Sequence, residues 1–90
     1  MFSKQATIRN EYGIHCRPSA IIAKEAQNYP GTVRVTTAHV SDISIDSILA
    51  LVGLGIKCGD TITVSVTGQD EEDTCNRMVE LFETNFDFPR

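Results

Sequence analysis

The chain has 90 residues, of which 41% are hydrophobic and 22% are charged, a balance typical of one small globular domain. A domain of this size buries roughly 60% of the surface of its unfolded chain, and it needs no metal or disulfide to fold. Eight basic residues against 12 acidic ones give a net charge of −4, which argues against a nucleic-acid-binding protein. The length also argues against a two-domain enzyme that depends on a cofactor. We expect a single domain over residues 1–90 with no cofactor.

The charge is distributed unevenly along the chain. Residues 1–34 contain five basic residues and two acidic ones, whereas residues 70–90 contain seven acidic residues and two arginines. We expect this distribution to give the folded protein one positive pole, which would steer a negatively charged partner toward it. Added salt should weaken that attraction.

No segment of the sequence predicts export or membrane insertion. The first residues lack the long apolar stretch of a signal peptide, and no apolar run approaches the length that crosses a bilayer. Three widely spaced cysteines, Cys16, Cys58 and Cys75, suit reduced thiols in a cytosol. We therefore expect a cytoplasmic monomer.

The first predicted elements are a strand and a helix. Alternation of apolar and polar residues predicts a strand that begins at Phe2 and includes Ile8, and residues 10–13 break it. Good helix formers from Cys16 to about residue 27 predict a helix, in which Pro18 is acceptable only in the first turn. The apolar residues expected on its inner face are Ile22, Ala23 and Ala26.

Two strands are predicted after this helix. Pro30 and Gly31 end the helix, and residues 32–37 then predict a strand with alternate valines on its inner side. Ile43 and Ile45 mark a third strand, which is short.

The second half of the chain predicts a helix, a strand and a final helix. A short apolar helix begins near Ser47 and ends at residues 53–55, which include two glycines. Strict alternation over residues 61–67 predicts the clearest strand of the chain. Acidic residues 70–73 fall in the first turn of a last helix, where the helix dipole favours negative charge. Its apolar residues repeat at helical spacing: Cys75, Met78, Val79 and Phe82.

The order of these elements predicts the fold class. A chain that runs strand, helix, strand, strand, helix, strand, helix suits an α+β fold with two layers. We expect an open-faced sandwich, in which a four-stranded antiparallel sheet carries three helices on one face.

The segment around His15 has the composition of an anion site. His15 lies at or beside the start of the first predicted helix, where backbone N–H groups lack partners inside the helix and the dipole is positive. The backbone amides of Cys16 and Arg17 can therefore bind a phosphate, and the Arg17 guanidinium adds donors. Gly13 permits the tight bend before the helix. The dipole also favours the neutral imidazole, which is the nucleophile that phosphoryl transfer needs.

Plainer interpretations of this segment exist. A single histidine beside a helix start is commonly a cap or a solvated side chain. A metal site made of His15, His39 and the cysteines fits no usual ligand spacing, so we expect no metal.

The His15 motif resembles the active-site signature of the HPr family, the histidine-containing phosphocarriers of the bacterial phosphotransferase system. The matching residues are Asn10, Gly13, Ile14, His15, Arg17, Pro18 and Ala20. The resemblance implies an HPr-like fold in which His15 takes a phosphoryl group on Nδ1 from Enzyme I and passes it to a IIA-type protein. It also implies that Arg17 stabilises the phosphate. Such a protein is a transfer intermediate and not an enzyme.

Ser47, together with Ile48 and Leu49, resembles a second site of this family, where a kinase phosphorylates a serine in some bacteria. The resemblance would add a serine kinase and phosphatase to the partners. Serine is also a favoured N-cap with no regulatory meaning. The preceding residue here is Asp46, where phosphorylatable members typically carry lysine, and its carboxylate should repel a phosphate.

The short apolar helix near Ser47 contains more apolar residues than one buried face requires, so some of them should be exposed and available for docking. In the family, this helix and the first one form the surface that meets Enzyme I and the IIA proteins. The residues that the resemblance assigns to partner binding are Cys16, Arg17, Ala20, Lys24, Ile48, Leu49 and Val52.

Two other functions remain open from the sequence. Residues 47–51 and 81–87 look closer to the regulatory NPr branch, which would make the chain a signalling module whose partner binding depends on phosphorylation. A small hydrolase acting on acyl phosphates is the third candidate, because small two-layer domains can hold phosphate with an arginine and backbone amides.

Overall fold

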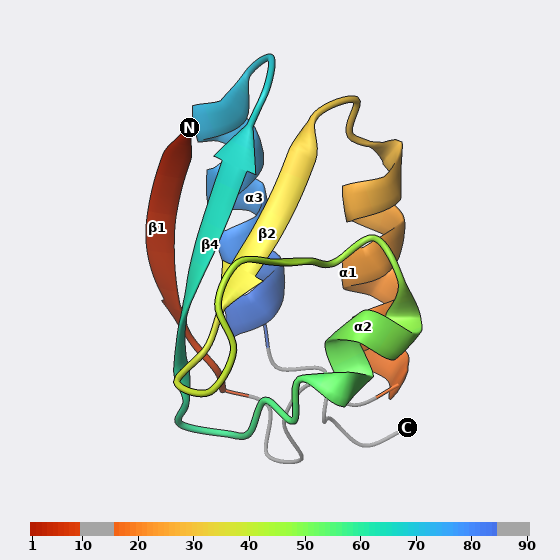
Figure 1. Cartoon of the computed structure of the whole chain (residues 1–90), viewed down its shortest axis with the longest axis vertical. Helices are drawn as coiled ribbons and strands as arrows, with labels where there is room; N and C mark the ends of the chain where they lie inside the picture. The colour runs from red at the N-terminus through yellow and green to blue at the C-terminus, as the bar shows by residue number, and fades with distance from the viewer. Residues whose placement is uncertain (10–15, 85–90) are drawn as a thin grey trace.

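A computed structural model describes residues 1–9 and 16–84 of the chain, with only the backbone described at residues 16 and 17. It contains seven elements in this part of the chain (Figure 1). They are β1 (Phe2–Thr7), α1 (Cys16–Asn28), β2 (Thr32–Thr36), β3 (Ile43–Ser44), α2 (Ile48–Gly53), β4 (Thr61–Thr67) and α3 (Glu71–Glu83). The predicted order of strands and helices is confirmed.

The four strands form one antiparallel sheet in the order β1-β4-β2-β3. The strictly alternating strand β4 lies at its centre and pairs with β1 and β2, so that Val64 lies opposite Lys4 on one side and Val35 on the other. The inward residues of β4, Ile62, Val64 and Val66, are fully or almost fully buried. A strand with neighbours on both sides and helices over one face has to bury every second residue, and its period-2 pattern satisfies that demand.

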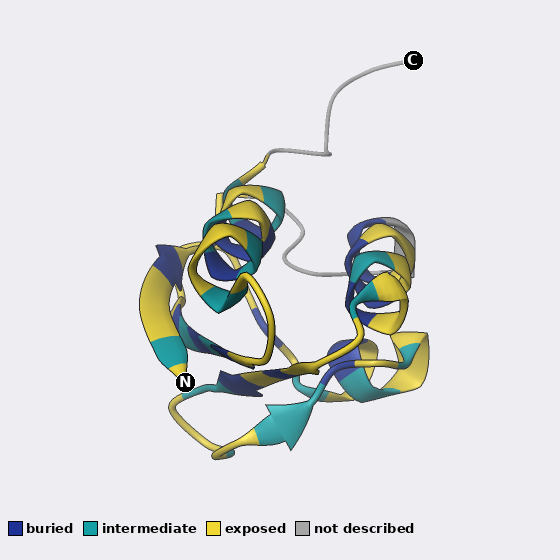
Figure 2. Cartoon of the chain, turned by 90° about the horizontal axis from the view of Figure 1, so that it is seen from above, coloured by how far each residue is buried: buried dark blue, intermediate teal, exposed yellow. Residues whose placement is uncertain are grey.

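The long helices α1 and α3 lie side by side over one face of the sheet, and the opposite face is open (Figure 2). The apolar residues of these two helices repeat at helical spacing and pack against the strands to form the core. These residues are Ile22, Ala23 and Ala26 of α1 and Cys75, Met78, Val79 and Phe82 of α3. The short helix α2 packs against α1 and inserts Leu51 into the same core. The predicted open-faced α+β sandwich is confirmed.

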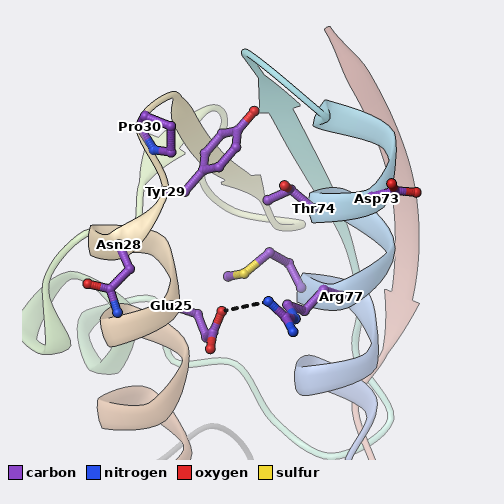
Figure 3. Close-up of a pocket in the computed structure, with 8 residues that line it drawn as sticks. Glu25, Asn28, Tyr29, Pro30, Asp73, Thr74 and Arg77 are labelled. Carbon is purple, nitrogen blue, oxygen red and sulfur yellow. Dashed lines mark ion pairs between the residues drawn. The ribbon is translucent and has the colours of Figure 1, made fainter.

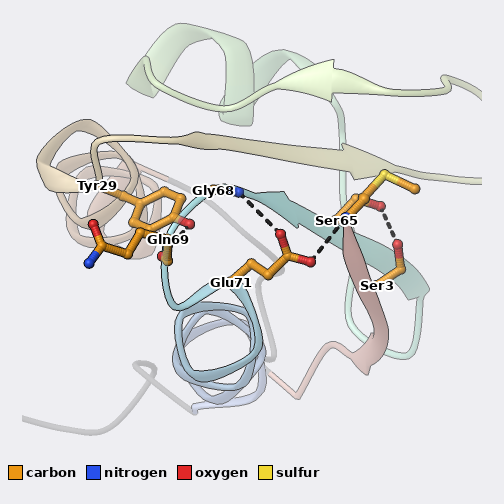
Figure 4. Close-up of polar contacts among 7 residues, drawn as sticks. Ser3, Tyr29, Ser65, Gly68, Gln69 and Glu71 are labelled. Carbon is orange, nitrogen blue, oxygen red and sulfur yellow. Dashed lines mark hydrogen bonds and ion pairs between the residues drawn. The ribbon is translucent and has the colours of Figure 1, made fainter.

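Tyr29, directly after α1, holds the turn before β2 against the turn after β4. Its hydroxyl donates to the carbonyl oxygen of Gln69 at 2.7 Å, and its ring lies over Gly31 and Gly68 (Figure 4). A Cβ at Gly31 would collide with the Thr67 carbonyl oxygen and the tyrosine ring, and Gly68 has a φ of +145°. Glycine is required at both positions because the two backbones approach closely under the ring.

One expectation differs from the structure. Asp70 does not belong to the first turn of α3: it is the N-cap, has a left-handed backbone, and makes no side-chain cap hydrogen bond. Helix α3 packs against β1, so the N-terminal ammonium lies 3.0 Å from a Glu71 carboxylate oxygen, and the expected positive pole stays a prediction. Lys4 Nζ lies 3.2 Å from Asn76 Oδ1, and Thr7 N–H donates to a Glu83 carboxylate oxygen at 3.0 Å.

Over residues 1–9 and 16–84, none of the helices combines the length and the apolar character that a bilayer crossing requires. Within the same ranges, the structure brings together no group of three or more histidine, cysteine, aspartate or glutamate side chains that could hold a metal ion.

Candidate functional site

The first turn of α1 is the anchor of the candidate site. The helix begins at Cys16, so residue 15 directly precedes its first helical residue. Pro18 and Ser19 are buried, which fixes this end of the helix against the rest of the domain. Because Pro18 has no N–H, Cys16 and Arg17 are the residues of the first turn before Ser19 that carry an amide donor. His15 itself, and the side chains of Cys16 and Arg17, lie outside the described residues.

The outward face of α1 extends from this end. Ala20 and Lys24, both assigned to partner binding from the sequence, are exposed one helical turn apart. Ile21 is exposed beside them, while the next residue, Ile22, is fully buried. Two consecutive residues of a helix point about 100° apart, so both isoleucines cannot face the core.

Helix α2 adds a second exposed apolar face. Leu49 is 84% exposed, and Ile48 and Val52 are also exposed, whereas Leu51 is completely buried. The sequence-based expectation that some residues of this helix face solvent is therefore confirmed. Since α2 packs against α1, we group the exposed apolar side chains of the two helices as the apolar patch. It consists of Ile21, Ile48, Leu49 and Val52.

The apolar patch is unusual for this molecule. Among the described residues, the only other large apolar side chain that is exposed is Met1. Exposed apolar groups that gather in one region mark docking surfaces for other proteins. The sequence did not single out Ile21 as an exposed apolar residue, although the adjacent isoleucines at positions 21 and 22 were a usable signal.

One polar contact ties the two helices together at the entry to α2. Gln27, near the end of α1, donates from Nε2 to the carbonyl oxygen of Asp46 at 2.6 Å. Asp46 immediately precedes the N-cap of α2. This hydrogen bond therefore limits how far α2 can move relative to α1.

Ser47 is the N-cap of α2. Its backbone is extended, and its hydroxyl oxygen accepts a hydrogen bond from the Ala50 amide at 3.1 Å. The neighbouring Asp46 side chain is exposed. The geometry thus gives the hydroxyl of Ser47 a structural role, and its phosphorylation stays a prediction.

The remaining candidate side chains are His39 and the three cysteines, of which the side chain of Cys16 lies outside the described residues. His39 is exposed in the turn between β2 and β3, where Thr37 N–H donates to the Val40 carbonyl oxygen at 2.7 Å. Cys58 is exposed, whereas Cys75 is buried and donates its thiol to the Val64 carbonyl oxygen at 3.4 Å. Burial raises the pKa of the Cys75 thiol.

Comparison with known proteins assigns the family. The model of the PTS HPr component phosphorylation site matches residues 2–84 of the chain. The chain belongs to the HPr family. This match includes the predicted His15 segment, the whole sheet and all three helices.

Individual relatives agree with this assignment. The chain is 35% identical to the phosphocarrier protein HPr of Mycoplasma pneumoniae over 79 residues, which cover 88% of the chain and 90% of the relative. It is 26% identical to the phosphocarrier protein NPr of Proteus mirabilis over 84 residues, or 93% of each protein. The similarity to this HPr therefore exceeds the similarity to this NPr, which does not favour the regulatory branch.

Solved structures show the same architecture. HPr-C-His from Thermoanaerobacter tengcongensis superposes with a TM-score of 0.86 over 100% of both chains, at 27% sequence identity. HPr from Bacillus anthracis gives a TM-score of 0.83 over 91% of this chain and 96% of that one, and at 21% identity it supports the fold alone.

Proposed function

We propose that this chain is a phosphoryl carrier of a phosphotransferase system, and that His15 is the residue that carries the phosphoryl group. The observation that carries the proposal is the family match over residues 2–84, whose defining feature is a phosphorylation site. The start of α1 at Cys16 supports the assignment, because it puts His15 directly before a helix N-terminus. A helix start supplies amide donors and a positive dipole end for an anion.

The proposed reaction is a transfer between two proteins. The lone pair of Nδ1 of a neutral His15 attacks phosphorus, and a new P–N bond forms as the bond that held the phosphoryl group on Enzyme I breaks. The hydrogen on Nε2 stays in place, and the donor group leaves with its electron pair. The reverse step onto a IIA-type protein uses the same geometry, so the phosphoryl group must be held without being trapped.

The residues after His15 have distinct roles in this proposal. The amides of Cys16 and Arg17 face the phosphoryl oxygens, and the Arg17 guanidinium adds charge-assisted hydrogen bonds. The absence of an N–H on Pro18 limits the backbone donors to these two amides. A small number of donors suits a carrier, because the phosphoryl group has to leave again.

We further propose that Enzyme I and the IIA-type protein dock on the apolar patch. Ile21, Leu49 and Val52 provide apolar area, and Lys24 is an exposed cation on the same side of α1. Interfaces between proteins typically have an apolar centre and a polar rim, which this arrangement provides. Both partners use one surface in this proposal, so they bind in turn.

Labelling with radioactive phosphoenolpyruvate and Enzyme I tests the proposal. The unmodified chain should take up acid-labile, base-stable phosphate, and the His15→Ala variant should take up none. His39→Ala is the matched control, because His39 is the only other histidine of the chain and lies in an exposed turn. It should be labelled like the unmodified chain. Labelling of His15→Ala at the normal rate would refute the assignment.

A further inference from the structure

A cleft lies between the C-terminal half of α1 and the N-terminal half of α3 (Figure 3). Its volume is about 490 Å³, which falls in the range of small-molecule sites. The lining residues from α1 and the turn after it are Glu25, Asn28, Tyr29 and Pro30, and those from α3 are Asp73, Thr74, Arg77 and Met78. The proposed phosphorylation site is at the other end of α1, which is a helix of 13 residues and thus about 20 Å long.

Two opposite charges face each other across this cleft. An Arg77 guanidinium nitrogen lies 3.8 Å from a Glu25 carboxylate oxygen, and the two side chains point toward one another (Figure 3). That distance is too long for a hydrogen bond, and the side chains are 71% and 40% exposed. Exposed ion pairs of this kind contribute little to stability. A ligand can therefore separate the two groups at small cost.

Beside the charged pair, the cleft has an apolar part formed by Met78, Tyr29 and Pro30, together with the polar residues Asn28 and Thr74. Met78 is only 1% exposed and belongs to the core, so it cannot withdraw from the cleft. Tyr29 is fixed by its hydrogen bond to the Gln69 carbonyl oxygen, and Pro30 continues the wall. A ligand meets a preformed apolar surface next to the charged pair.

The charged groups around the cleft determine which ligands it can bind. Asp73 also lines the cleft, but its side chain points away from the Glu25–Arg77 pair in Figure 3, so Glu25 and Arg77 are the charged groups that face each other across the cleft. Desolvation raises the pKa of Tyr29, and the nearby carboxylates of Glu71 and Asp70 raise it further. A purely anionic ligand would pair with Arg77 but lie against Glu25, and a purely cationic ligand would pair with Glu25 but lie against Arg77.

We propose that this cleft binds a small zwitterion of the amino-acid class with an apolar side chain. The ligand carboxylate binds the Arg77 guanidinium, the ligand ammonium binds the Glu25 carboxylate, and the side chain lies against Met78 and Tyr29. The two charges of such a molecule are only a few atoms apart, so it can contact Arg77 and Glu25 at the same time. Its binding replaces one loose ion pair by two charge-assisted hydrogen bonds. The site is independent of the proposed carrier function.

Three ligands of similar size test the charge requirement. L-leucine carries both charges, L-leucinamide only the ammonium, and 4-methylpentanoate only the carboxylate. Titration of the isotope-labelled full chain, followed by its amide NMR signals, should give saturable shifts at Thr74 and Arg77 with L-leucine. Each single-charge analogue should bind about tenfold more weakly or worse, because one charge-assisted hydrogen bond is lost.

Variants then assign each charge to its residue. Glu25→Gln should weaken L-leucine binding about tenfold but should not weaken 4-methylpentanoate binding, because it removes a like charge from that anion. Arg77→Gln should weaken L-leucine binding equally but should not weaken L-leucinamide binding, because it removes a like charge from that cation. Glu80→Gln, an exposed residue of α3 outside the cleft, is the matched control and should bind L-leucine normally. All three variants should still be phosphorylated by Enzyme I, which separates this site from the carrier function.

Several outcomes would overturn the zwitterion site. They are the absence of a saturable shift with L-leucine, equal binding of the three ligands, shifts centred on the apolar patch, and unchanged L-leucine binding in both cleft variants.

Discussion

Helix α1 has α2 on one side and α3 on the other, and the two sides carry different surfaces. Toward α2, the exposed residues are apolar and stand out from the molecule, as Leu49 does. Toward α3, the surface is concave and a loose ion pair of Glu25 and Arg77 crosses it. A raised apolar surface suits another protein, whereas a concave charged one suits a small molecule. The two sides of α1 therefore differ in shape and charge, and we assign protein docking to one side and small-molecule binding to the other.

Leu51 provides the strongest contrast with the apolar patch, because it belongs to the same short helix and is completely buried. Leu51→Ala should lower the free energy of unfolding by about 2–5 kcal/mol, since it removes core contacts and leaves a cavity. Urea denaturation measures this change. A loss below about 0.5 kcal/mol would show that α2 is not anchored in the core as described.

Leu49 should behave in the opposite way. Leu49→Ser removes an exposed side chain, so the free energy of unfolding should change by no more than about 0.5 kcal/mol. The KM for phosphorylation by Enzyme I should rise about tenfold or more, since a central apolar contact of the proposed docking surface is lost. Steady-state labelling rates at varied carrier concentration measure it. An unchanged KM would remove Leu49 from the docking surface.

Ser47 tests whether α2 depends on its cap. Ser47→Ala should destabilise the protein by about 1 kcal/mol, because the Ala50 amide loses its acceptor. Ser47→Asp should recover most of this stability, since aspartate is an equally good cap. Thermal unfolding of the two variants distinguishes them. Equal stability of Ser47→Ala and the unmodified chain would mean that the hydrogen bond makes no net contribution.

Cys75 gives the smallest expected effect and concerns the core beneath α3. Burial raises the pKa of its thiol, so the folded protein keeps the proton that the unfolded chain releases. The stabilisation is complete below the unfolded pKa of about 8.5 and is lost as the pH rises through the folded pKa. Cys75→Ala should show a shallower loss of stability above about pH 8.5 than the unmodified chain. Identical slopes in denaturation at several pH values would contradict this.

Local patterns were sufficient to predict most of the fold. The alternation in residues 61–67 placed the central strand, and the helical spacing of Met78 and Phe82 placed the inner face of α3. Backbone geometry at Asp70 could not be predicted in the same way, because its left-handed conformation is set by the turn after β4 and not by helix preference. The contact between the N-terminal ammonium and Glu71 also depends on how β1 packs against α3, which no local pattern specifies.

The site was predictable to a smaller extent. The exposure of residues in α2 followed from its excess of apolar residues. In α1, the adjacent residues Ile21 and Ile22 likewise indicate that one of the two is exposed. The contact between Glu25 and Arg77 was not predictable, because the residues are 52 positions apart and meet only through tertiary packing. Ion pairs between segments that are distant in the sequence can be identified only from the three-dimensional structure.

The most direct test of the account is to locate the phosphoryl group itself. The chain is phosphorylated by Enzyme I and phosphoenolpyruvate, kept at alkaline pH, and digested, and the phosphorylated residue is mapped by fragmentation in a mass spectrometer. The account predicts one phosphoryl group, on His15, that disappears when a dephosphorylated IIA-type protein is added. A phosphoryl group on His39, Ser47 or another residue, with His15 unmodified, would contradict it.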